Sequence, residues 1–134
     1  MFVLAASPAA ATMNASPISK TPCPSAAVVN AALGQKNKAP AATTTPYAKI
    51  CTYKGTGIVP TRITFQEDTA ATFAAGEKAA AAVGPVVKVP NLGKSAWAPK
   101  SGGGLYVFLG TESLRMVSPL TPTTKLETLA RKII

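Results

Sequence analysis

The sequence has no histidine, two cysteines and five acidic side chains among its 134 residues. Without an imidazole, the chain cannot form the Cys-His or Ser-His pairs on which many hydrolases depend. A zinc site needs three or four Cys, His or carboxylate ligands held close together, and this sequence has no cluster of that kind. We therefore expect neither a metal nor another cofactor.

Long apolar runs and large side chains are also scarce. No stretch approaches the roughly 20 apolar residues of a membrane-spanning helix, and aromatic residues make up only 6% of the chain. Apolar residues reach 47%, with alanine supplying much of that share. The length therefore predicts one small domain with a small core, in which a covalent cross-link would contribute much of the stability.

The two cysteines stand at positions that suit such a cross-link. Cys23 directly precedes a short helical pattern, and Cys51 lies in a predicted strand. One pair placed in this way is typical of a structural disulfide in an oxidising compartment, and it would stabilise the fold by roughly 3–4 kcal/mol. The alternative is two free, buried thiols in a cytosolic protein.

The net charge of +9 raises the question of an anionic partner. The lysines are spread along the whole chain, without a basic run of five and without the alternation of basic and aromatic residues that stacks bases. We expect a solvated basic surface facing an anionic envelope or membrane surface, and nucleic acid is disfavoured as a partner. A basic protein that binds polyanions or nucleic acid remains the second hypothesis.

Residues 1–22 are rich in Ala, Ser, Pro and Thr, which predicts a disordered tail. Residues 1–6 followed by small residues are also typical of the end of a secretory signal, although the basic segment that normally precedes one is missing. We therefore divide the chain into a tail or signal-peptide remnant at 1–22 and a single domain at 23–134.

The rest of the pattern predicts an α+β domain in the order α-β-β-α-β-β-β-α. A mostly antiparallel sheet of about five strands carries its helices on one face, and Thr124 with Glu127 forms a capping box for the last helix. Residues 35–46 are predicted to be a loop. The predicted helices cover residues 24–33, 69–83 and 124–133, and the strands 49–54, 58–67, 96–98, 105–109 and 113–118. The side chains expected to point inward from the first two strands are Cys51, Tyr53, Ile63 and Phe65.

Few motifs suggest catalysis. The run Gly93-Lys94-Ser95 is similar to the end of a phosphate-binding loop, but Lys88 stands where that motif needs its first glycine. A hydrolase that uses Ser95 with Lys94 or Lys100, or a pair of carboxylates across a cleft, is the third hypothesis. No catalytic residue is assigned.

Aromatic residues suggest a binding surface more directly. Tyr106 and Phe108 share one face of a predicted central strand, and Trp97 is the sole tryptophan. We expect these three side chains to line a ligand surface, with Lys94 and Lys100 at its rim. The alternative is that they pack beneath a loop or a second covering layer.

Several short motifs follow one another along the chain in a specific order. Pro22-Cys23 precedes a short helix that ends at Leu33-Gly34, Cys51-Thr52-Tyr53 follows, and later come residues 89–93 and Ala96-Trp97. This order resembles a family of small secreted actinobacterial (mycobacterial-type) proteins, many of them lipoproteins, over residues 22–134. The resemblance implies an envelope location and paired cysteines, and it supplies no catalytic residues. It departs from the family at the lipid-acceptor motif, because Cys23 follows Thr21-Pro22 and not an apolar run.

These observations favour a secreted or envelope-associated domain that is not an enzyme. Its partner would be a small apolar or anionic ligand, or another envelope protein.

Overall fold

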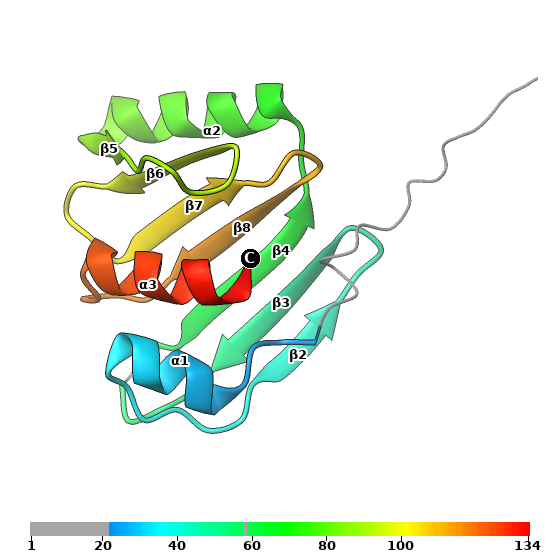
Figure 1. Ribbon diagram of the computed structural model, residues 1–134, viewed down its shortest axis with the longest axis vertical. Coiled ribbons are helices and arrows are strands. Elements are labelled where there is room, and N and C mark those ends of the chain that lie inside the picture. Colours follow the sequence, from blue (N-terminus) through cyan, green and yellow to red (C-terminus); the bar gives the residue numbers. More distant parts are fainter. Residues whose placement is uncertain (1–21, 58) are drawn as a thin grey trace, which may run out of the picture.

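The computed structural model describes residues 22–57 and 59–134, so the tail expected at 1–22 lies almost entirely outside the described residues. The described chain forms one antiparallel sheet with helices on both of its faces (Figure 1). Its elements are α1 (Ala26–Leu33), β2 (Ala41–Thr44), β3 (Ala48–Tyr53), β4 (Thr61–Glu67), α2 (Ala70–Val83), β5 (Val86–Lys88), β6 (Ser95–Pro99), β7 (Gly104–Phe108), β8 (Glu112–Val117) and α3 (Thr123–Ile133).

The strand order in the sheet is β2-β3-β4-β8-β7-β6-β5. The last strand, β8, lies beside β4 in the middle, so it joins two meanders that come from the two halves of the chain. Every pair of neighbouring strands is antiparallel. This arrangement confirms the α+β class and the mostly antiparallel sheet.

The main core lies between the sheet and the pair α1 and α3, which contact each other on one face (Figure 1). Cys51, Tyr53, Ile63 and Phe65 point into this core, as their alternation along β3 and β4 predicts. Strands β7 and β8 and helix α3 complete it with the buried side chains Leu105, Val107, Leu114, Met116, Leu126, Leu129 and Ala130.

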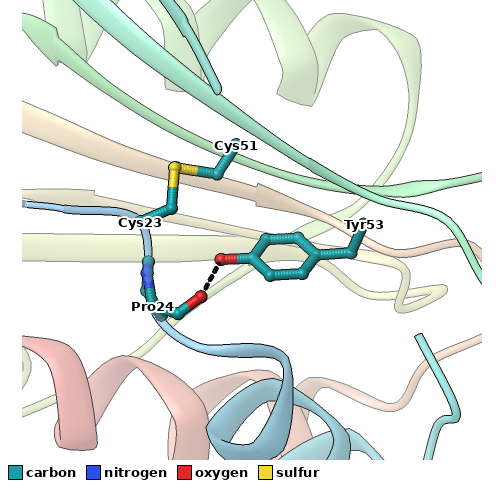
Figure 2. Close-up of a disulfide and its surroundings, with 4 residues drawn as sticks. All are labelled: Cys23, Pro24, Cys51 and Tyr53. Carbon is teal, nitrogen blue, oxygen red and sulfur yellow. Dashed lines mark hydrogen bonds between the residues drawn. A yellow bond between two sulfur atoms is a disulfide. The ribbon is translucent and has the colours of Figure 1, made fainter. Parts of the chain in front are cut away.

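A disulfide between Cys23 and Cys51 ties the segment before α1 to β3, which confirms the predicted cross-link (Figure 2). Beside it, the Tyr53 hydroxyl donates a hydrogen bond to the Pro24 carbonyl oxygen, so the same segment is held at a second point. Burial raises the pKa of Tyr53 to about 12, because the phenolate would lose its hydration.

Helix α2 packs on the opposite face of the sheet, above β5, β6 and β7. The expectation that all helices share one face is therefore wrong. The physical reason lies in β7, where Leu105 and Val107 point to the main core while Tyr106 and Phe108 point to the other side. A strand that is apolar on both faces needs a cover on each.

The number of strands also differs from the prediction, since the described residues form seven and not about five. Strand β2 lies inside the predicted loop at residues 35–46. All four of its residues are exposed, so no hydrophobic alternation marks it in the sequence. Strand β5 occupies three residues of the stretch that follows α2 and pairs with β6. Both are edge strands that form by pairing with a neighbour.

The predicted capping box of α3 is wrong. The N-cap residue is Pro122, and no side chain caps the helix. Thr124 lies within the helix, and its carbonyl oxygen accepts a hydrogen bond from the Thr128 hydroxyl. The buried stripe of Leu126, Leu129 and Ala130 is as predicted.

No helix in the described part of the chain has the length and apolar character needed to cross a bilayer.

Candidate functional site

A groove of about 360 Å³ lies between α2 and the sheet. That volume falls near the lower end of the range of about 300–1,000 Å³ typical of small-molecule sites. The residues from α2 and its preceding turn are Asp68, Thr72, Phe73, Gly76 and Ala80, and those from the sheet are Gln66, Trp97, Tyr106, Ser113 and Arg115.

The floor of the groove follows one row across the sheet. Trp97 on β6 is paired with Tyr106 on β7, and Tyr106 with Arg115 on β8. The indole and phenol rings are stacked, with centroids 4.2 Å apart and planes 14° apart. The Arg115 guanidinium carbon lies 5.6 Å from the Tyr106 ring centroid, within the range of a cation–π contact. The row therefore presents a flat aromatic surface that ends in a fixed positive charge.

Two of the residues that line this groove each carry a buried polar atom without a partner. Among the described residues, neither Trp97 Nε1 nor Ser113 Oγ makes a hydrogen bond, and both atoms are buried. Their side chains belong to residues that are 5% and 1% exposed. Buried polar groups in folded proteins are nearly always hydrogen-bonded, and leaving one unpaired costs about 1–3 kcal/mol. Both atoms are closed off from solvent in this structure, so an acceptor group from outside the chain would pair with them only after the side chains or α2 move.

Helix α2 is held lightly over the groove. Within α2, Phe73 is the only buried residue, and its ring lies 5.5 Å from that of Phe108. A salt bridge of 2.7 Å also joins Lys88 to Glu77 of α2, and the lysine side chain in it is 71% exposed. Exposed pairs of this kind contribute little to stability. Ala80, which is partly buried, is the other residue of α2 that packs against the aromatic cluster, so α2 buries few apolar side chains on this face.

The structure brings together only part of the predicted binding surface. Trp97 and Tyr106 line the groove, whereas Phe108 lies beneath α2 against Phe73 and is not part of the lining. Lys94 and Lys100 lie outside the groove as well. The backbone amide of Lys94 donates a hydrogen bond to the Phe108 carbonyl oxygen. Lys100 lies in the turn after β6, and its backbone amide donates to the Pro85 carbonyl oxygen. Lys94 and Lys100, which were expected at the rim of the ligand surface, are therefore not among the residues that line this groove.

Ser113, Arg115 and Gln66 were not among the predicted site residues. Alternation along β8 and β4 does place these residues on one face of the sheet. What the sequence did not reveal is that β4 and β8 are neighbours, with Gln66 opposite Ser113 and Thr64 opposite Arg115.

A second hollow of about 350 Å³ lies at the C-terminal end of α1, beside Gln35, Asn37, Thr61 and Ser118. Its polar side chains satisfy one another. The Gln35 amide nitrogen donates to Ser118 Oγ at 2.8 Å, and the Gln35 amide oxygen accepts from Thr61 at 3.1 Å and from Asn37 at 2.8 Å. Ser118 Oγ also lies 2.8 Å from Thr121 Oγ1. This network is a structural connection between the α1–β2 loop and the turn before α3.

In the described part of the chain, no three His, Cys, Asp or Glu side chains gather as metal ligands would. Comparisons of the chain with protein-family models, with curated proteins and with solved structures return no match. The resemblance to secreted actinobacterial proteins thus stays a prediction, and the geometry of the groove is the basis for a function.

Proposed function

We propose that this protein is an extracytoplasmic, non-enzymatic binding domain that holds a small ligand in the groove between α2 and the sheet. The observation that carries the proposal is that two residues lining the groove, Trp97 and Ser113, each keep a buried polar atom, Nε1 and Oγ, without a hydrogen-bond partner among the described residues. The indole N–H is a donor only, and the hydroxyl can donate. A ligand whose acceptor groups reached these atoms would remove the cost of leaving them unpaired.

The cross-link supports the location. Structural disulfides persist in oxidising compartments and are rare in the cytosol, and the Cys23–Cys51 bond ties down the main core. The excess of positive charge also suits a surface that faces anionic polymers or lipids. Both observations agree with the resemblance to secreted proteins.

The proposal is tested with anilinonaphthalene sulfonate, an aromatic anion whose emission rises in apolar surroundings. Because Trp97 is the only tryptophan, energy transfer from it to the probe reports binding at the groove. We expect saturable binding with one probe per chain and quenching of the tryptophan emission.

A matched pair of α2 variants locates the site. A Cβ added at Gly76 meets no atom within 4 Å, so Gly76→Leu fills groove space and raises helix propensity by about 0.8 kcal/mol. Ala82→Leu adds the same side chain at an exposed position outside the lining. We expect Gly76→Leu to weaken probe binding at least about tenfold and Ala82→Leu to leave it unchanged. Equal binding by both variants and the wild-type chain would contradict the proposal.

A further inference from the structure

The groove carries opposite charges at its two ends. Arg115 lies opposite Thr64 on β4, and Asp68 follows Thr64 by four residues on the same face. Strand residues advance about 3.3 Å each, so the two charged positions are about 13 Å apart along the strand direction. Gln66 and Ser113 form the row between them, while Trp97 stands in the row of Arg115. The order along the groove is thus a carboxylate, uncharged hydrogen-bonding groups and a guanidinium.

Both end charges are available to a ligand. Neither Asp68 nor Arg115 takes part in a salt bridge with another described residue. One oxygen of Asp68 accepts a hydrogen bond from the Thr69 backbone at 2.8 Å, which orients the carboxylate at the start of α2 and leaves its other oxygen open. The Arg115 guanidinium contacts the Tyr106 ring, which leaves its N–H groups free to donate.

We propose that the ligand is a short peptide with both ends free, bound in an extended conformation along this groove. The inference rests on the proposed function, since it names the ligand class for the same site. Three extended residues span about 10–11 Å, and the side chains of Asp68 and Arg115 bridge the remaining length. The terminal ammonium pairs with Asp68, and the terminal carboxylate accepts from the guanidinium of Arg115, a geometry that arginine favours.

The middle of the peptide would face Ser113, and its carboxyl-terminal part would lie in the row of Trp97 and Arg115. A backbone carbonyl oxygen is an acceptor of the kind that Trp97 Nε1 and Ser113 Oγ lack. An apolar side chain from the central residue would pack against Phe73 and the Tyr106 ring, which border the same space. The peptide thus offers opposite charges to Asp68 and Arg115 at its ends and an acceptor to Ser113 between them.

Other ligand classes use the groove less well. A nucleic acid or another polyanion would bring negative charge along the whole groove and place some of it against Asp68. A fatty acid would satisfy Arg115 but leave the Asp68 carboxylate facing hydrocarbon, which is costly. A molecule with opposite charges at its ends avoids both penalties.

The test follows the indole N–H signal of Trp97 by NMR on the isotopically labelled full chain. One tryptophan gives one indole resonance, and a new hydrogen bond at Nε1 would move it. The probes are the tripeptide alanyl-leucyl-alanine, its N-acetylated form and its C-terminal amide. We expect the free tripeptide to bind and shift the signal. We expect each blocked form to bind about tenfold more weakly or worse, because each loses one charged contact.

Two variants test which residue binds which end of the peptide. Asp68→Asn keeps an oxygen for the Thr69 amide, and it should bind the free and the acetylated tripeptide equally. Arg115→Gln should bind the free tripeptide and its amide equally, while it still discriminates against acetylation. Arg115 is exposed and Asp68 is half-buried, and the amide spectrum of each variant checks its fold.

The outcomes separate the two proposals. If the sulfonate probe binds in the Gly76-sensitive manner but the tripeptide does not, the peptide assignment is wrong and the binding groove stands. The same conclusion follows if blocking either end changes the affinity less than about twofold, or if the variants keep the wild-type discrimination. If neither the probe nor the peptide binds at the groove, the proposed function itself is wrong.

Discussion

The two faces of the sheet are covered in opposite ways. The face under α1 and α3 carries a large continuous core, a disulfide and a hydrogen-bond network in which Gln35 and Ser118 satisfy their neighbours. The face under α2 carries three buried aromatic side chains, one exposed salt bridge and two unpartnered polar atoms. One face is arranged for stability, and the other keeps unused hydrogen-bonding capacity.

The comparison also shows that volume is a poor guide to function here. The hollow beside Gln35 and the groove under α2 have nearly equal volumes, about 350 and 360 Å³. They differ in whether their polar groups are paired with one another. Because unpaired buried groups cost free energy, a fold keeps them more readily where a ligand compensates.

The largest effect is expected from removing the cross-link on the α1 face. The Cys23→Ala, Cys51→Ala double variant should lose roughly 3–4 kcal/mol of unfolding free energy, because the bond closes a loop between residues 28 positions apart. Urea denaturation of both chains, with and without reductant, measures this loss. The reductant should destabilise the wild-type chain and leave the double variant unchanged.

The groove lies on the other face, so the folded variant should still bind the sulfonate probe. Loss of that binding in the folded variant would show that the two faces are not independent.

A smaller effect is expected from ionising Tyr53. Its pKa is raised to about 12 in the fold, whereas an unfolded chain ionises near 10.0. The unfolded chain therefore loses this proton first, so stability is complete below pH 10 and falls as the pH rises from about 10 to 12. Two pKa units correspond to about 2–3 kcal/mol. The difference in unfolding free energy between the wild-type chain and Tyr53→Phe, followed across this range, measures the effect. A difference that does not change with pH would contradict it.

The smallest effect is expected from replacing one of two buried serines, Ser113 and Ser118, which are both 1% exposed. Ser118 lies 2.8–2.9 Å from three polar partners, whereas Ser113 Oγ has none among the described residues. Ser118→Ala should therefore cost about 1–3 kcal/mol of unfolding free energy, whereas Ser113→Ala removes an unpaired buried hydroxyl and should raise the unfolding free energy by up to about 1–3 kcal/mol. Thermal or urea denaturation of the two variants, side by side, measures the contrast. If Ser113→Ala were as destabilising as Ser118→Ala, Ser113 would be a structural residue and the groove would lose its main support.

The part of the fold that could be predicted is the part with local signals. Alternation in β3 and β4 correctly placed Cys51, Tyr53, Ile63 and Phe65 in the core, and the stripe of Leu126, Leu129 and Ala130 located the last helix. The loop signals failed at β2, whose exposed residues have no pattern of their own. Of the groove, the aromatic pair Trp97 and Tyr106 was predicted, and the lysines at the rim were not found there.

The sequence by itself determined which side chains alternate to each face, where the helices form and which two cysteines are available to pair. These properties depend on periods of two or about 3.6 residues and on composition, which a linear chain carries in full. Only the tertiary structure decided that β8 lies between β4 and β7 and that α2 covers the second face. Those choices depend on pairing between residues far apart in the chain. They place Ser113 and Arg115 between Gln66 and Tyr106 and so create the groove.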